Sequence, residues 1–317
     1  MKLNYEETLL DLARGDDRIV VLTSENRAAI RNLPAELGDR FIDFGITEQT
    51  MVGAAAGLAL RGRVPVVHAL ATFLTMRAFE FVRTDVGLGA LPVKLVGGVP
   101  GFLSEANGPT HQAIEDISLM RGIPGMEIFC PADAEELTLG MRALISRPNP
   151  CYVRYNAAAP AVEHIKPFSF EKAEVLREGS DVTIVSFGIL LKETLKAADI
   201  LEGEGRRVRL VNLHTLKPVD EATILKSAIN TDILVTVEDH LQSGGLYSII
   251  CDLLAGHYVR CPVFPIALRE RWFKPAMLPD VLDYEGFTGK RIAERIVDAL
   301  DGLDPYLIVK GNRWQIL

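Results

Sequence analysis

The sequence predicts an α/β protein built from two consecutive three-layer α/β/α domains with mostly parallel sheets. Two observations predict this class. Short runs rich in β-branched residues alternate with longer runs of helical pattern, which is the order of a parallel sheet with crossover helices. The alternation stops once, at a segment with two prolines and an alanine run, and then resumes. We therefore expect domains at residues 1–158 and 173–317, joined by a linker at 159–172.

The first domain is expected to hold strands that are buried on both faces. They are Ile19–Thr23, Phe41–Phe44, Val64–His68, Pro92–Val96, Met126–Cys130 and Cys151–Arg154. The helical patterns between them cover Thr47–Arg61, Leu74–Ala90 and Asp133–Ser146. Each helix follows a strand, so this half of the chain reads as repeated βα units.

The second domain repeats this architecture without a residue-level repeat. Its expected strands are Val182–Phe187, Val208–Leu213, Ile233–Val237 and Val263–Leu268. Its expected helices are Leu190–Glu204, Asp220–Ile229 and Ser243–Leu254.

Composition excludes several classes of protein. The 317 residues are 48% hydrophobic, which excludes a disordered chain, and the net charge of −8 argues against a nucleic-acid partner. The four cysteines form no CxxC pair, so we expect reduced thiols and a cytoplasmic location. The charge-free stretch Met51–Leu60 is too short to span a membrane. Phosphate-binding, zinc-protease and hydrolase signatures are absent as well.

Glu48 is the first candidate for chemistry. It follows the strand Phe41–Phe44, and Thr47 is the expected N-cap of the next helix. Since Met51–Leu60 carries no charged side chain, we expect that helix to be buried all round. Two interpretations stay open on spacing alone: Glu48 complements the helix dipole, or it is a carboxylate at the mouth of a buried helix.

Three further features are candidates. His111 ends a loop stiffened by glycine and proline after a predicted parallel strand, where open α/β sheets bind ligands. Arg154 ends another strand and can hold a phosphate or carboxylate, or form a surface ion pair. Phe73, Phe79 and Phe81 form either an apolar wall or ordinary core packing.

Several segments together resemble the carboxyl-terminal half of a transketolase. In the first domain they are DFGITEQTMVGAAAGLALRG, ATFLTMRAFEFVR, NGPTHQAIEDISLMR and PADAEE. In the second they are VNLHTLKPVDEATI and VTVEDHLQSGGL. The resemblance implies a thiamin-diphosphate-binding fold, here the pyrimidine-binding domain, followed by a fold like the transketolase C-terminal domain.

The resemblance also implies a cofactor and a partner. The family uses thiamine diphosphate, and its metal and diphosphate motif, a GDG followed by an Asn, is absent from this chain. We therefore expect a split transketolase. Its separate N-terminal subunit binds Mg²⁺ or Ca²⁺ and shares the cofactor, and this chain contributes no metal ligand. We also expect an α2β2 assembly, and Gly53, Ala54 and Gly57 either lie at its interface or pack within the same domain. The apolar segment Pro305–Leu317 is a further candidate for covering a neighbour.

Cofactor-binding residues follow from matched positions. Glu48 resembles the glutamate that hydrogen-bonds the pyrimidine ring and promotes proton removal from the thiazolium carbon, so it is both a catalytic and a cofactor-binding residue. Phe73 matches the aromatic residue that stacks on the pyrimidine, with Met76 and Phe79 beside it.

Substrate-binding residues are matched in the same way, and here the chain departs from the family. His111 matches a catalytic histidine facing the reacting end of the substrate, Arg154 a phosphate-binding arginine, and Asn107 stands where the family commonly has Asp. Two positions at which the family binds phosphate fall near Val99 and Ile30, which are apolar. The hypothesis is that the substrate is not the ordinary pentose phosphate pair, or that its phosphate is held differently.

The resemblance implies transfer of a two-carbon ketol group from a ketose or ketose phosphate to an aldose. An alternative is an enzyme like 1-deoxyxylulose-5-phosphate synthase, which FVRTDVGLGALPVKLVGG resembles, or like the beta subunit of a 2-oxo acid dehydrogenase. A third interpretation is a non-catalytic subunit that kept the fold.

Overall fold

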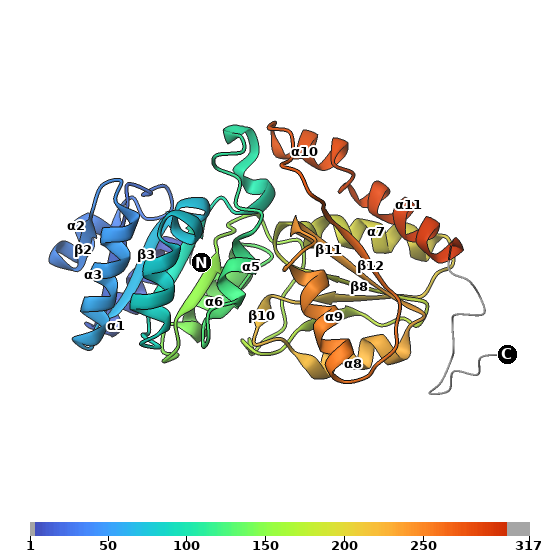
Figure 1. Ribbon diagram of the computed structural model, residues 1–317, viewed down its shortest axis with the longest axis horizontal. Coiled ribbons are helices and arrows are strands. Elements are labelled where there is room, and N and C mark those ends of the chain that lie inside the picture. The colour runs from blue at the N-terminus through green and yellow to red at the C-terminus, as the bar shows by residue number, and fades with distance from the viewer. Residues whose placement is uncertain (1–3, 303–317) are drawn as a thin grey trace.

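The computed structural model describes residues 4–302 and contains two sheets, one in each half of the chain (Figure 1). The first sheet has the strand order β10-β5-β6-β4-β3-β1-β2, and the second has the order β12-β11-β8-β9-β7. All pairs are parallel except β10 with β5 and β7 with β9. The predicted fold class is therefore confirmed.

Ten of the twelve strands in residues 4–302 lie close to their predicted positions, whereas those at Glu174–Arg177 and Thr215–Lys217 were not predicted. In the first half they are β1 (Ile19–Thr23), β2 (Phe41–Asp43), β3 (Val64–Leu70), β4 (Lys94–Gly98), β5 (Glu127–Phe129) and β6 (Cys151–Arg154). In the second half they are β7 (Glu174–Arg177), β8 (Val182–Ser186), β9 (Val208–Asn212), β10 (Thr215–Lys217), β11 (Ile233–Leu241) and β12 (Val263–Leu268).

Helices cover both faces of each sheet. Those of the first half are α1 (Tyr5–Gly15), α2 (Leu33–Leu37), α3 (Glu48–Leu60), α5 (Asp116–Arg121) and α6 (Ala134–Leu144). Those of the second half are α7 (Leu191–Gly203), α8 (Glu221–Asn230), α9 (Leu246–Gly256), α10 (Leu278–Tyr284) and α11 (Gly289–Asp301). No helix within residues 4–302 is long and apolar enough to cross a bilayer.

Alternation along β1 shows how the layers form. Ile19 and Val21 pack in the apolar cluster beneath α1 and α6, whereas Val20 and Leu22 pack in the cluster beneath α3. The second cluster runs on into the other half of the chain, where it takes in Phe187 and residues of α8 and α9. A continuous core therefore joins the two sheets.

Leu74–Ala90 is not one helix, so that prediction is wrong. The chain forms a π-helical turn η2 (Phe73–Arg77), a short helix α4 (Phe79–Phe81) and a second π-helical stretch η3 (Val82–Gly87). The Ala78 amide donates to the Phe73 carbonyl, five residues back. A π-helical turn holds one more residue than an α-helical turn, and a helical sequence pattern does not reveal that single insertion.

The expected burial of α3 on all sides is also wrong for the single chain. Met51, Val52 and Ala55 are buried, but Gly57 is exposed and Leu60 is 73% exposed. Gly57 and Leu60 therefore lie at the surface of the described chain.

Other elements were not predicted. Helix α1 begins with a capping box between Asn4 and Glu7, a signal that the sequence contains. Strand β10 comes from the second half and completes the first sheet by pairing with β5. Residues 159–172 form neither helix nor strand, and the domain boundaries stay predictions. The segment Pro305–Leu317 lies outside the described residues.

Candidate functional site

Glu48 is the first residue of α3, directly after β2 and a short turn. Thr47 is at the N-cap as predicted, but its hydroxyl donates to the Phe44 carbonyl (2.8 Å) and does not cap the helix. The Thr47 amide donates to Ser24 Oγ at 3.0 Å. These bonds fix the start of the helix, and Glu48 is only 2% exposed there. A carboxylate in such a position is costly to bury without partners.

Arg77 is the partner that the structure supplies. Its Nη1 donates to Glu48 Oε2 at 2.9 Å, and its guanidinium carbon lies 4.0 Å from the centre of the Phe73 ring. Phe73 and Arg77 are four residues apart on the helical turn η2, so their side chains lie on the same face. Arg77 was not predicted as a site residue, although its spacing of four residues from Phe73 is a signal that could have placed the two side chains together.

His111 completes the group. Its ring lies 5.2 Å from the Phe73 ring at an angle of 69°, and its carbonyl accepts from Thr72 Oγ1 at 2.7 Å. Thr110 Oγ1 lies 2.9 Å from His111 Nδ1. The structure therefore brings Glu48, Phe73 and His111 together from three separate segments.

The remaining predicted residues lie nearby in the chain. Met76 and Phe79 are half-buried on the segment that carries Phe73, and Phe79 packs against the core. Asn107 is exposed at the end of the loop helix η4 (Gly101–Asn107), four residues before His111. The roles of all these residues stay predictions.

Arg154 does not belong to this open group, which corrects the expectation that it binds substrate. It is 3% exposed, its Nε donates to Asp116 Oδ2 at 2.8 Å, and its Nη1 donates to Asp239 Oδ1 at 2.6 Å. Burial alone would lower the pKa of Arg154, but the two carboxylates outweigh it and raise the pKa well above its usual value. The guanidinium is therefore committed to a buried ion triad that joins the two halves of the chain.

The two expected phosphate positions lack polar side chains, as the sequence states. Ile30 is fully buried in the core beneath α1. Val99 is half-buried, with φ at +49°, just before the loop that carries His111. Neither side chain can accept or donate a hydrogen bond to a phosphate.

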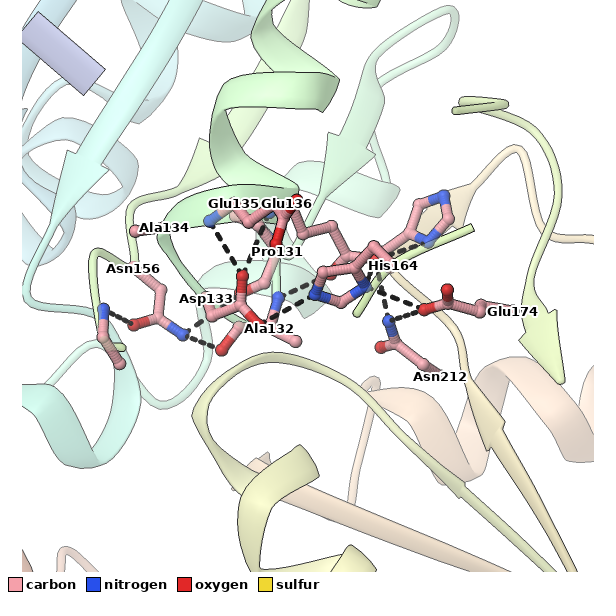
Figure 2. A network of polar contacts seen from close by, with 12 residues as sticks. Pro131, Ala132, Asp133, Ala134, Glu135, Glu136, Asn156, His164, Glu174 and Asn212 are labelled. Atoms are coloured by element: carbon pink, nitrogen blue, oxygen red, sulfur yellow. Dashed lines mark hydrogen bonds and ion pairs between the residues drawn. The ribbon is translucent and has the colours of Figure 1, made fainter. Parts of the chain in front are cut away.

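A second polar group lies where the linker passes between the sheets (Figure 2). His164 Nε2 lies 2.8 Å from Asp133 Oδ2, and His164 Nδ1 lies 2.8 Å from Glu174 Oε2. Asn212 Nδ2 donates to Glu136 Oε1 at 2.7 Å. The contacts tie the linker to the start of α6, to β7 and to β9.

This group has the composition of a metal site, since Glu136, His164 and Glu174 each offer a ligand atom within 4.8 Å of the others. Both ring nitrogens of His164 lie 2.8 Å from carboxylate oxygens, one of Asp133 and one of Glu174. Burial alone would lower its pKa, but hydrogen bonds to Asp133 and Glu174 outweigh it and raise the pKa to about 10. Because these contacts tie the linker to α6 and β7, we assign this group a structural role.

This role predicts a pH dependence of stability. The pKa of His164 is higher in the folded than in the unfolded state, so its protonated form stabilises the fold. This stabilisation is complete below pH 6.5 and is lost as the pH rises through about 10. Between these values the free energy of unfolding should fall by up to about 1.4 kcal/mol per pH unit. Urea unfolding of the chain at pH 7, 8.5 and 10 measures this.

Two variants provide the comparison. His164→Gln should lose about 3 kcal/mol at pH 7 and show a flatter pH dependence. His257→Gln is the control, because His257 pairs with Glu221 at the surface, where both side chains are about half exposed. Equal pH slopes in wild type and His164→Gln would contradict the assignment.

Two family models match this chain, one in each half. Residues 2–159 match the family model "Transketolase, pyrimidine binding domain", and residues 171–292 match "Transketolase, C-terminal domain". A 6-deoxy-6-sulfo-D-fructose transketolase subunit from a Clostridium species is 36% identical over 91% of this chain and 90% of its own length.

Two further similar proteins are a solved structure of similar length and a longer enzyme. A solved split-gene transketolase, described as an inactive beta4 tetramer, is 32% identical, covers 94% of this chain and 96% of its own, and has a TM-score of 0.84. A 1-deoxy-D-xylulose-5-phosphate synthase from Heliobacterium modesticaldum is 35% identical over 93% of this chain, which spans 47% of that enzyme. The chain therefore belongs to the transketolase family and corresponds to the carboxyl-terminal subunit of a split transketolase.

Proposed function

We propose that this chain is the C-terminal subunit of a thiamine-diphosphate-dependent transketolase, which transfers a two-carbon ketol group from a ketose or ketose phosphate to an aldose. The observation that carries the proposal is the buried carboxylate of Glu48, grouped with Phe73 and His111. Membership of the transketolase family implies use of thiamine diphosphate. We propose in addition that Glu48, Phe73 and His111 contact the cofactor and substrate, and that the complex carries out the transfer.

The chemistry of the donor set fits the pyrimidine ring of the cofactor. Within residues 4–302 only Oε2 of Glu48 has a hydrogen-bond partner, so Oε1 is left for a ring nitrogen. Phe73 offers a flat apolar surface beside it. When bound, thiamine diphosphate supplies an electron sink for breaking and forming carbon–carbon bonds. Glu48 would hold or pass a proton at the ring, and its burial strengthens that hydrogen bond.

His111 and Asn107 would act on the sugar. The contact of His111 Nδ1 with Thr110 leaves Nε2 free to exchange a proton or hydrogen bond with a substrate hydroxyl. Asn107, exposed on the same loop, can donate to and accept from sugar hydroxyls. Arg154 is left out of this set because its guanidinium is fully engaged.

The chain alone would not form a complete site. It lacks the metal and diphosphate motif, so we propose that an N-terminal subunit binds Mg²⁺ or Ca²⁺ and shares the cofactor. The apolar side of α3, with Gly57 and Leu60 exposed, supports an interface there in an α2β2 assembly. The solved beta4 relative described as inactive is consistent with this dependence. We place the complex in the cytoplasm.

A donor screen on the assembled complex tests the reaction. We expect two-carbon transfer from a ketose, and no reaction with pyruvate. Pyruvate as the preferred donor would favour the second candidate function, an activity like that of 1-deoxy-D-xylulose-5-phosphate synthase. The 35% identity to that enzyme supports this candidate.

The same screen tests how the anionic end of the substrate is held. The apolar Val99 and Ile30 remove two hydrogen-bonding groups, and the Clostridium relative is named for a sulfosugar in place of a phosphosugar. We therefore expect weak discrimination between phosphorylated and unphosphorylated ketoses. Strong preference for xylulose 5-phosphate would overturn this part of the proposal.

A further inference from the structure

A cluster of arginines lies in the last part of the described chain, and neither Glu48 nor His111 lines its cavity. A cavity of about 340 Å³ opens between the end of β12, the turn before α11 and α11 itself. Arg269, Arg271 and Arg295 line it, together with Glu285 and the ring of Phe287. Three cations around one carboxylate is unusual in a chain whose net charge is −8.

The charges in this cavity are not balanced. Glu285 is taken by Arg271, whose Nη1 donates to Oε1 at 2.9 Å. Within residues 4–302, Arg269 and Arg295 have no carboxylate partner. Arg295 is half-buried, and its guanidinium carbon lies 6.0 Å from the centre of the Phe287 ring. Its pKa is lowered, mainly by burial and to a smaller extent by repulsion from Arg269.

We propose that this cavity is a binding site for a small oxyanion, of the size of a phosphate-bearing metabolite, held between Arg269 and Arg295. Guanidinium groups pair with phosphate through two parallel hydrogen bonds, and a dianion would remove the repulsion between the two cations. The volume lies within the range of small-molecule sites. Glu285 is paired with Arg271, so its carboxylate does not neutralise Arg269 or Arg295.

The cavity is connected to the loop of His111. Phe273, on the same segment as Arg269 and Arg271, packs on Phe102 with ring centres 5.2 Å apart, and its carbonyl accepts from Gln112 Nε2 at 2.8 Å. The amide of Leu278, at the start of α10, donates to Glu105 Oε1 in the neighbouring blue-green loop (Figure 1). The segment that carries Arg269 and Arg271 is therefore in contact with the loop that carries His111.

Calorimetry of the full chain with inorganic phosphate, and separately with ribose 5-phosphate, tests the proposal, with sodium chloride matched for ionic strength. The Arg269→Gln/Arg295→Gln double variant should weaken binding by at least about tenfold, because it removes both charge-assisted contacts to the anion. Arg291→Gln is the matched control, since Arg291 lies one turn earlier on α11 and pairs with Glu294 at 3.0 Å.

Circular dichroism and the thermal midpoint should show that all variants fold. Saturable binding that is lost in the double variant and kept in Arg291→Gln supports the site. Tighter binding of ribose 5-phosphate than of inorganic phosphate would identify a phosphorylated metabolite as the ligand, and equal binding would identify the phosphate group alone. No saturable binding up to about 10 mM, or equal binding by all variants, would overturn the site. These readouts do not depend on the proposed transferase activity.

Discussion

Replacing Glu48 with glutamine is expected to lower ketol transfer by the assembled complex by about 10²- to 10⁴-fold, the range typical of a lost general acid–base group. Glutamine keeps the shape of the side chain and can still bond Arg77, but it cannot take up or release a proton at neutral pH. Steady-state turnover with the partner subunit measures the effect. The folded structure should be unchanged, because Arg77, the partner of Glu48, is itself partly exposed to solvent.

Glu80→Gln is the matched control for this variant. Glu80 is exposed on α4, a few residues from Phe73, and its replacement should leave turnover unchanged. If Glu48→Gln retained wild-type activity, the assignment of Glu48 would be wrong. The interpretation of the chain as a non-catalytic subunit would then gain support.

Replacing Arg154 with methionine is expected to destabilise the chain by about 3–5 kcal/mol, enough to unfold many proteins of ordinary stability. The substitution leaves Asp116 and Asp239 buried without a cation. It also affects the His111 loop, because Asp239 Oδ2 accepts from the Phe102 amide at 3.2 Å. Urea unfolding and soluble yield measure the loss.

A triple variant separates charge from packing. Asp116→Asn and Asp239→Asn remove the two buried charges, so adding them to Arg154→Met should recover a substantial part of the lost stability. If Arg154→Met instead folded normally and raised KM only for phosphorylated sugars, Arg154 would be a substrate ligand after all. That result would restore the expectation made from sequence.

Ten strands were predictable because most of them carry consecutive β-branched or aromatic residues that are buried. Strand β10 was not, because it is three residues long and finds its partner β5 in the other half of the chain. The break at Phe73–Arg77 depends on one extra residue in a helical turn. The exposed side of α3 is apolar in sequence, so its pattern cannot tell burial within the chain from an uncovered face.

The candidate site was predictable in its members and less so in their contacts. Glu48, Phe73 and His111 follow from separate motifs, and the structure brings them together. Arg77 was missed because its partner Glu48 lies 29 residues away, which no local pattern reveals. Arg154 was misassigned because its partners, Asp116 and Asp239, lie 38 and 85 residues away, which no local pattern reveals.

Titration of the chain with thiamine diphosphate and Mg²⁺ by calorimetry tests the central claim most directly. It is done first on this chain alone and then with an N-terminal transketolase subunit from the same organism. The split-subunit account predicts no saturable binding by the chain alone and one cofactor per pair of subunits in the complex. Tight binding by the chain alone would contradict it, because the diphosphate and metal would then have a site within this sequence.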